Sequence, residues 1–338
     1  ENQITIIAIV NNNATGTIPS EIGELSELTE LWLYKNNLAS TIPASLGNLK
    51  ALKRLALYSN KFRGPMPKSF TNLTNLQILS LGDNELSGKI PVSIGDMKEL
   101  TTIHMHHNYL SGAIPRSIGK MKNLDQLSLF ANYLSGTVPR NIFSLESLRG
   151  LWIGDNFLTG YFEPSSMKQL SNLVWLEAYD NYITGTLPPI FSELKFLRVA
   201  LLNNNLINGH IPALVFKMSS LQSLSIGDNL LTGSIPSVVG DSMVLEKLYL
   251  EKNSLTGIIP SSIGSVLSLQ EIDISENLLN GTVPETISQL SNLKGLWLEG
   301  NKISGSIEFF CVKRLSLLTD LEADCKLDVK CSCCSACS

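Results

Sequence analysis

Asparagine recurs along this chain at a nearly constant interval. Thirteen asparagines lie 24 residues apart, except for one step of 25: Asn12, Asn36, Asn60, Asn84, Asn108, Asn132, Asn156, Asn181, Asn205, Asn229, Asn253, Asn277 and Asn301. A period of this length is typical of a solenoid, in which one short unit is stacked many times. The chain is therefore predicted to form one elongated stack of coils.

The unit of the repeat is complete between Leu76 and Pro91, where the sequence follows the pattern LxxLxLxxNxLxGxIP. Alternation at Leu79 and Leu81 predicts a short strand with both leucines in the core and Ser80 facing water. The asparagine that follows is predicted to bond to backbone groups of its own turn and of the neighbouring turn, so that the stacked amides form a ladder.

Two further positions of the repeat predict backbone conformation. Glycine stands four residues after the asparagine in twelve of the thirteen repeats, with Ser40 as the exception, which predicts a tight bend. Proline stands seven residues after it in eleven of the thirteen, which predicts extended backbone before a short helical or 3₁₀ turn.

Over residues 4–308 the longer pattern LxxLxLxxNxLxGxIPxxLGxLxxL resembles the plant-type leucine-rich repeat of receptor-kinase ectodomains and polygalacturonase-inhibiting proteins. The resemblance implies an α/β solenoid that winds as a right-handed superhelix. It implies a parallel sheet on the concave face, with 3₁₀ or irregular segments and partial second strands on the convex side. Residues 1–310 are predicted to form thirteen repeats, and residues 311–338 a degenerate terminal repeat with a cysteine-rich cap.

Composition narrows the class of protein. Hydrophobic residues make up 43% of the chain and the mean hydropathy is +0.13, but no run approaches the 18 apolar residues of a transmembrane helix. Stacked coils explain the apolar content, because they join their leucines into one core. A net charge of −4 without a basic stripe argues against a nucleic-acid partner.

All six cysteines lie at the C-terminal end: Cys311, Cys325, Cys331, Cys333, Cys334 and Cys337. They predict a local set of disulfides, for which the sequence leaves fifteen pairings open. A zinc site within the CxCCxxC run is the less favoured alternative, because zinc ligands usually come from two separated pairs. The ending ADC…CSCCSAC resembles the cap of secreted leucine-rich repeat proteins of diatoms and related algae.

Disulfides and glycosylation sequons both predict an extracellular protein. The sequons begin at Asn13, Asn72 and Asn280, on positions that the repeat assigns to turns or to the convex side. At least one is expected to carry an N-linked glycan, although an Asn- and Thr-rich chain also forms sequons by chance.

The residues two, four and six before each asparagine are predicted to lie on the exposed side of the main sheet, which we call the concave face. All four tryptophans and several other aromatics occupy it: Trp32, Tyr34, Tyr58, Phe130, Trp152, Trp175, Tyr179, Tyr249 and Trp297. They form two groups in the sequence, one near the N-terminus and one around Trp152 and Trp175. Such side chains predict a binding surface for a protein, peptide or glycan. The alternative is that β-propensity favours them and they pack on one another.

Histidines and charges mark the same face. His104 and His106 point to one side of a strand, but the neighbouring strands offer no further metal ligand, so a ligand contact sensitive to pH is favoured over a metal site. Basic residues mark the N-terminal strands and acidic residues the C-terminal ones, a gradient that either orients a partner or serves solubility: Lys35, Lys53 and Arg54; Glu246, Glu251, Glu271, Asp273, Glu276 and Glu299.

The sequence offers no sign of catalysis. It contains no phosphate-binding glycine loop, no zincin motif and no serine nucleophile elbow, and an open sheet lacks the enclosed pocket that tunes catalytic pKa values. We predict a binding protein that needs no cofactor.

Two irregularities add further expectations. The first coil, which places Ile4, Ile7 and Ile9 in the core, has no cysteines near it, so its edge is predicted to be open. An alternative function follows: a structural extracellular glycoprotein that assembles end to end into homo-oligomers or filaments. In the seventh repeat Phe162-Glu163 replaces Ile-Pro, which predicts an interrupted second strand.

Overall fold

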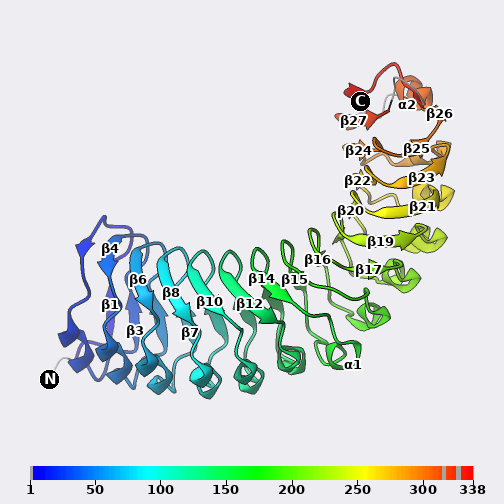
Figure 1. The fold of residues 1–338 in the computed structure, drawn as a ribbon. Helices are drawn as coiled ribbons and strands as arrows, with labels where there is room; N and C mark the ends of the chain where they lie inside the picture. The colour runs from blue at the N-terminus through cyan, green and yellow to red at the C-terminus, as the bar shows by residue number, and fades with distance from the viewer. Residues whose placement is uncertain (1–2, 314–316, 325–328, 338) are drawn as a thin grey trace. The chain divides into compact units, whose positions relative to one another are not determined.

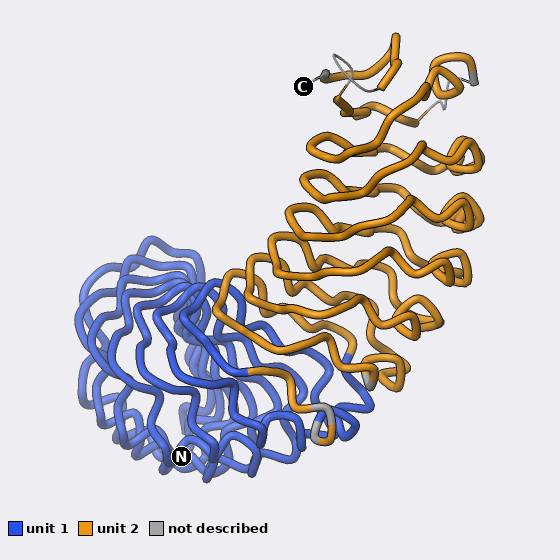
Figure 2. The backbone as a smooth tube through the Cα atoms, turned by 45° about the vertical axis from the view of Figure 1, so that its right-hand side comes forward, with its two compact units in different colours: residues 1–160, 166–173 blue, residues 161–165, 174–338 orange. Residues whose placement is uncertain are grey.

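A computed structural model describes residues 3–313, 317–324 and 329–337. It divides into two compact units, residues 1–160 with 166–173 and residues 161–165 with 174–338, which Figure 2 shows in different colours. The units are built from the same kind of coil, and each is described by itself.

Each coil contributes one short strand to a parallel main sheet (Figure 1). In unit 1 these strands are β1 (Ile6–Ala8), β3 (Glu30–Trp32), β5 (Arg54–Ala56), β7 (Ile78–Ser80), β9 (Thr102–His104), β11 (Gln126–Ser128) and β13 (Gly150–Trp152). In unit 2 they are β15 (Trp175–Glu177), β16 (Val199–Leu201), β18 (Ser223–Ser225), β20 (Lys247–Tyr249), β22 (Glu271–Asp273), β24 (Gly295–Trp297), β27 (Asp320–Ala323) and β29 (Ala336–Cys337). The predicted solenoid is confirmed.

The register of the main sheet follows the repeat. Leu55 pairs with Leu79 and Leu79 with Ile103, each one repeat away, and all three side chains are fully buried. The prediction that Ser80 faces water is wrong. Its side chain lies on the concave face but is only 8% exposed, because it is small and stands beside the larger His104.

A second strand follows the asparagine in most coils. Unit 1 has β2 (Thr15–Gly16), β4 (Asn37–Ser40), β6 (Lys61–Pro65), β8 (Glu85–Lys89), β10 (Tyr109–Gly112), β12 (Tyr133–Thr137) and β14 (Phe157–Thr159). Unit 2 has β17 (Asn208–Gly209), β19 (Leu230–Gly233), β21 (Ser254–Ile258), β23 (Leu278–Gly281) and β25 (Lys302–Ile303), with β26 (Gly305–Ser306) paired to β28 (Val329–Lys330). The second sheet of unit 1 ends at β14 and that of unit 2 begins at β17, which confirms the interruption predicted at the irregular repeat.

Short 3₁₀ helices complete the coils, each preceded by a proline as the repeat predicts. They are η1 (Ser20–Glu24), η2 (Ala44–Asn48), η3 (Lys68–Asn72), η4 (Val92–Asp96), η5 (Arg116–Lys120) and η6 (Arg140–Ser144), and then η7 (Pro189–Glu193), η8 (Ala213–Lys217), η9 (Ser237–Asp241), η10 (Ser261–Ser265) and η11 (Glu285–Gln289). Two short α-helices are α1 (Pro164–Met167), which lies in the irregular repeat, and α2 (Glu308–Lys313).

The asparagine ladder has the predicted chemistry. The Asn132 side chain, 6% exposed, donates to the carbonyl oxygens of Met105, Leu129 and Phe130 at 3.0, 3.0 and 3.2 Å. Its Oδ1 accepts the backbone N–H of Leu110 at 3.0 Å. One amide therefore bonds backbone groups of two adjacent turns and supplies the acceptor for the buried N–H of Leu110.

The glycine four residues after each ladder asparagine allows the bend that the repeat predicts. Gly136 has φ of 75°, in the left-handed region that side chains disfavour. Ser40, the one exception, adopts φ of 78° at the same position. The repeat therefore requires this backbone conformation whether or not glycine supplies it.

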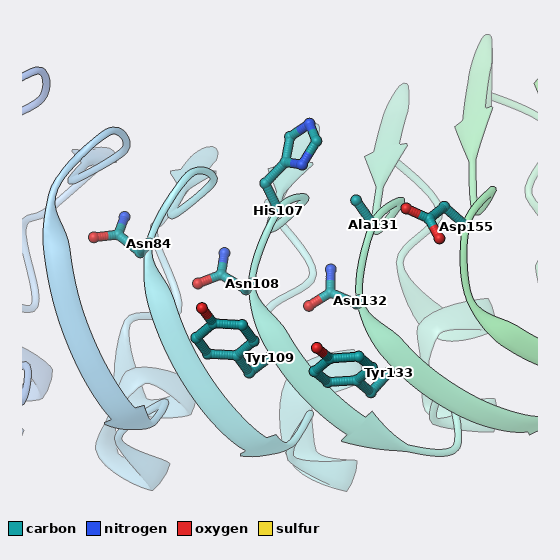
Figure 3. A pocket seen from close by; sticks show the side chains of 8 residues that line it. All are labelled: Asn84, His107, Asn108, Tyr109, Ala131, Asn132, Tyr133 and Asp155. Atoms are coloured by element: carbon teal, nitrogen blue, oxygen red, sulfur yellow. The ribbon is translucent and has the colours of Figure 1, made fainter.

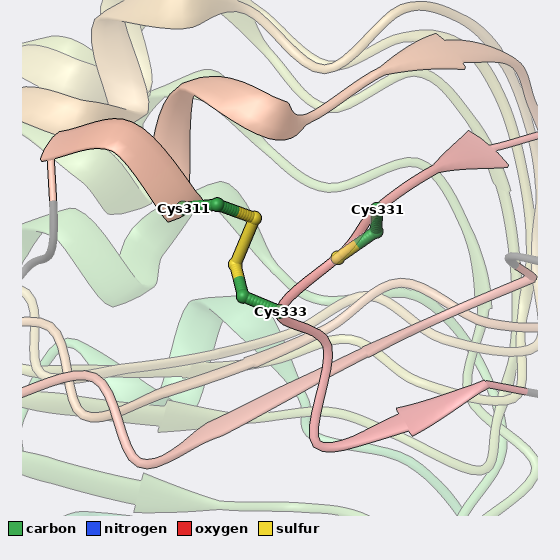
Figure 4. A group of neighbouring side chains, drawn as sticks. All are labelled: Cys311, Cys331 and Cys333. Atoms are coloured by element: carbon green, nitrogen blue, oxygen red, sulfur yellow. A yellow bond between two sulfur atoms is a disulfide. The ribbon is translucent and has the colours of Figure 1, made fainter.

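Disulfides close the C-terminal end. Cys311 pairs with Cys333 (Figure 4), and Cys331 pairs with Cys334. Although sulfur atoms of Cys311, Cys331 and Cys333 lie within 4.8 Å of one another, disulfide sulfurs are not thiolates and do not favour the zinc alternative. The predictions for Cys325 and for the Cys337 side chain fall outside the described residues, and the boundary between residues 310 and 311 stays a prediction.

The first coil carries exposed apolar side chains. Ile4 and Ile9 are 54% and 43% exposed and Ile7 is half-buried, so the outer side of these residues is open as predicted. Assembly through this edge stays a prediction. Among the described residues, no helix has the length and apolar content needed to cross a membrane.

Candidate binding surfaces

The first predicted aromatic group comes together on the concave face of unit 1. Trp32 contacts Tyr34 edge to face at 6.2 Å between ring centroids, and Tyr34 stacks on Tyr58 at 4.4 Å with the planes 10° apart. The Trp32 indole N–H donates to Glu30 at 2.9 Å, and Arg54 donates to the same carboxylate at 2.6 Å. The group is therefore pre-ordered, and the stacked tyrosines cover part of each other's faces.

A second group forms around the histidines. The His106 ring stacks on Phe130 with centroids 4.8 Å apart and an interplanar angle of 3°. His106 Nδ1 is 3.0 Å from the Ser128 hydroxyl, and His104 Nε2 is 3.1 Å from Gln126 Oε1. Burial lowers the pKa of His104 and of His106, and for His106 this outweighs the opposite effect of Asp83 on the pKa. The imidazoles are therefore held in their neutral form to lower pH than usual.

Two tryptophans pack against the glycine two residues before them in the same strand. A methyl group added at Gly150 would come within 2.0 Å of the Trp152 indole, and one added at Gly295 within 2.2 Å of the Trp297 indole. Each indole therefore occupies the space that a side chain at the glycine would fill, and each is half-buried. The sequence signal for this arrangement is Gly-Leu-Trp, which occurs in both units.

The predicted group of Phe130, Trp152, Trp175 and Tyr179 divides between the units. Phe130 and Trp152 belong to unit 1, and Trp175 and Tyr179 to unit 2. Trp175 is 37% exposed, and Tyr179 is half-buried.

Several carboxylates lie on the concave face of unit 2. Tyr249 donates its hydroxyl to Glu271, whose other oxygen lies 2.9 Å from Lys247 Nζ. Asp273 accepts from the Ser275 hydroxyl at 2.6 Å. The Glu251 carboxylate lies over Gly227, where an added methyl group would come within 1.9 Å of its oxygen.

Burial shifts the ionisation of these acids. It raises the pKa of Glu251 to about 7, and it raises the pKa of Asp273 and of Glu299. One buried oxygen of Glu251 and one of Glu299 have no hydrogen-bond partner. These groups are incompletely solvated and would gain from a donor.

The positive end of the predicted charge gradient is partly neutralised. Arg54 pairs with Glu30, whereas Lys35 and Lys53 are exposed. At the other end, Lys247 pairs with Glu271.

Sequence reasoning missed a second surface on unit 1. Tyr109, Tyr133 and Phe157 each follow a ladder asparagine directly and begin β10, β12 and β14, where they are 51%, 50% and 46% exposed. Their 24-residue spacing was a visible signal. We call these three residues the lateral row.

An open pocket of about 430 Å³ lies beside the lateral row (Figure 3). It is lined by Asn84, His107, Asn108, Tyr109, Ala131, Asn132, Tyr133 and Asp155. His107 and Asp155 stand on the turns before their ladder asparagines and are both exposed.

The three sequon asparagines, Asn13, Asn72 and Asn280, are exposed, so each is accessible to a glycan. Their occupancy stays a prediction.

Comparison with known families finds leucine-rich repeats along most of the chain. A leucine-rich repeat region matches residues 9–173, and leucine-rich repeats match residues 220–242 and 244–303. A leucine-rich repeat protein of Leptospira interrogans is 32% identical, with a TM-score of 0.67 over 90% of this chain and 80% of that one. The chain belongs to the leucine-rich repeat family.

Two plant receptors also resemble this leucine-rich repeat protein. The peptide hormone receptor RGFR1, solved with RGF2, is 37% identical with a TM-score of 0.86 over 87% of this chain and 47% of the receptor chain. The Arabidopsis receptor kinase HAESA, solved with the peptide hormone IDA and the co-receptor SERK1, is 28% identical with a TM-score of 0.57 over 94% and 69%. The repeats are thus of the plant type, and the chain spans about half the length of RGFR1. No curated protein matches the chain.

Proposed function

We propose that this protein is an extracellular recognition module that binds a peptide, or an extended segment of a protein, on its concave face without catalysing a reaction. The observation that carries the proposal is the packing of two indoles against glycine. Gly150 and Gly295 have no side chain, and the indoles of Trp152 and Trp297 occupy the space that one would fill. Pre-ordered aromatic side chains bind partners at a low entropic cost.

The relatives support the class of ligand. RGFR1 and HAESA were both solved with peptide hormones, and this chain resembles them across most of its length. Disulfides at the C-terminal end and exposed sequons support the extracellular placement.

The carboxylates of unit 2 suggest which side chains the ligand carries. Glu251 and Glu299 each bury an oxygen that lacks a hydrogen-bond donor. A lysine or arginine of the ligand would supply that donor and favour the charged carboxylates. We therefore expect peptides that bind unit 2 to contain a basic residue.

The proposal is tested by selecting linear peptides from a displayed random library on the intact protein. Trp152→Ala and Trp297→Ala remove an indole, whereas Gly150→Ala keeps the indole and displaces it. We expect each to weaken the selected peptides about tenfold or more, as hot-spot aromatics do. Tyr133→Leu, off the concave face, is the matched control and should bind as the original protein does.

Selected peptides that bind all four variants equally would contradict the concave site. A different result would identify a glycan ligand in place of a peptide. In that case the library would yield no binder, and the original protein would capture oligosaccharides that Trp152→Ala does not. Thermal unfolding of each variant establishes that the repeats remain folded.

A further inference from the structure

The lateral row presents three parallel, evenly spaced rings. Ring centroids of Tyr109 and Tyr133 are 5.9 Å apart and those of Tyr133 and Phe157 are 6.0 Å apart, with interplanar angles of 11° and 9°. Figure 3 shows the faces of the two tyrosines turned the same way. The equal steps follow from the strands that begin at these residues.

The rings leave much of their surface open. In the concave pair Tyr34 and Tyr58 the centroids are only 4.4 Å apart, so the two rings cover each other. In the lateral row the centroids of parallel rings are about 6 Å apart, so neighbouring rings cover less of each other. The exposed fractions of 46–51% agree with this spacing. Exposed aromatic surface arranged in a row is characteristic of binding surfaces.

The fold does not require aromatic rings at this position. The equivalent residues of unit 2 are Tyr182, Leu206, Leu230, Ser254, Leu278 and Lys302, and the three leucines are 41%, 53% and 43% exposed. Unit 1 itself has Lys61 and Glu85 there. The repeat therefore accepts aliphatic and charged side chains, and the three rings call for another explanation.

Polar groups border the row on the side of the pocket. The amides of Asn108 and Asn132 are committed to backbone groups, but His107 and Asp155 are exposed on their turns. The tyrosine hydroxyls add two further hydrogen-bonding groups. Apolar ring faces with donors and acceptors along one edge suit a ligand that has apolar faces and a polar rim.

We propose that the lateral row and its pocket form a binding site for an extended, neutral oligosaccharide. A linear β-linked glycan repeats flat sugar rings along its axis, and their C–H faces stack on aromatic rings while their equatorial hydroxyls hydrogen-bond at the edges. Evenly spaced parallel rings match such a periodic ligand better than an irregular peptide. A nucleic acid also stacks on aromatics, but its phosphates would meet Asp155 on a chain of net charge −4.

The lateral row is separate from the concave face. The proposal of a glycan site can therefore be wrong while the proposal of peptide binding is right, and the reverse. Isothermal titration of the intact protein with cellohexaose and with N-acetylchitohexaose tests the glycan site. The variant Tyr109→Leu/Tyr133→Leu/Phe157→Leu removes the rings but uses a side chain that the repeat already accepts. We expect it to bind the recognised hexasaccharide roughly tenfold more weakly or worse, and Tyr109→Phe/Tyr133→Phe to stay within about threefold.

Three outcomes overturn the proposal. One is that the original protein binds neither hexasaccharide at millimolar concentration. Another is that the leucine variant binds as well as the original, or that Trp152→Ala alone abolishes binding, which would place the glycan on the concave face. The third is that the original protein self-associates in light scattering and the leucine variant does not, which would make the row a self-interface.

Discussion

The concave faces of the two units share one scaffold but carry different chemistry. Unit 1 presents stacked rings, such as Tyr34 on Tyr58 and His106 on Phe130. Unit 2 presents carboxylates, with Glu251 over Gly227 and Glu271 between Tyr249 and Lys247. The difference teaches that the ladder and the leucine core hold the sheet, and that the residues between them are free to vary.

The same difference makes the units respond oppositely to pH. In unit 1 burial lowers the pKa of the two histidines, so the folded state resists protonation. In unit 2 burial raises the pKa of three carboxyl groups, so the folded state resists ionisation. Acid should therefore weaken unit 1, and neutral or higher pH should weaken unit 2.

The largest loss of stability is expected from changes in the asparagine ladder, which both units share. Asn229 repeats the bonds of Asn132, donating to Leu202, Ile226 and Gly227 at 3.1, 3.2 and 2.9 Å and accepting from Ile207 at 2.9 Å. Asn132→Ala and Asn229→Ala each leave one buried N–H, of Leu110 or Ile207, without its acceptor and remove one hydrogen bond from each of three carbonyls. Each should lower the free energy of unfolding by about 3 kcal/mol. Urea denaturation measures both, and clearly unequal losses would break the premise of one shared scaffold.

Glu251→Gln isolates the carboxylate contribution of unit 2. Because the pKa of Glu251 is about 7 when folded and ordinarily 4.5, folding binds a proton between these values, and stability falls as pH rises through them. The variant should melt higher than the original at pH above 7 and lose this advantage by pH near 4.5. Thermal melts across that range check it, with the exposed Asp241→Asn as control. A pH-independent difference would indicate a packing effect instead.

His104→Gln/His106→Gln isolates the imidazole contribution of unit 1. Since burial lowers the pKa of both groups below the ordinary 6.5, the unfolded chain binds protons first as pH falls. The original protein should therefore lose stability below about pH 6.5, and the double variant should lose less over the same interval. Melting temperatures at pH 7.5 and 5.5 provide the comparison. The exposed His210→Gln, in unit 2, should retain the full acid sensitivity.

The smallest effect should come from the ion pairs. Glu30–Arg54 at 2.6 Å and Glu271–Lys247 at 2.9 Å are both partly exposed, with Arg54 44% and Lys247 41% accessible. Arg54→Gln and Lys247→Gln should each change the free energy of unfolding by less than about 1 kcal/mol, and less still in high salt. Denaturation at two salt concentrations tests this. A larger, salt-insensitive loss in one unit would show that its concave face is drier than the other.

The repeat made much of the fold predictable. The alternation at Leu79 and Leu81 placed β7, and the asparagines placed the turns, because period and polarity are properties of local sequence. The concave positions of Trp152 and Trp297 follow from the same register. The glycines beneath them were visible in the sequence, but their meaning depends on how an indole lies in space.

Other features could not be predicted from one repeat alone, because they depend on contacts with residues of the neighbouring repeat. The lateral row depends on the second strands, because the repeat pattern alone does not show that Tyr109, Tyr133 and Phe157 lie side by side on adjacent strands, although they share the period. Burial of Ser80 depends on the size of His104 beside it. Of the fifteen pairings open to the cysteines, proximity selected Cys311–Cys333 and Cys331–Cys334.

The sequence by itself determined the solenoid, its strand positions and the ladder, since a 24-residue period imposes one backbone path on every coil. Only the tertiary structure decided which rings close on each other and which stay open, and which carboxylates lose their water. These outcomes depend on side-chain packing between coils, where a ring spacing of 4.4 Å covers Tyr34 and one of 5.9 Å leaves Tyr133 open.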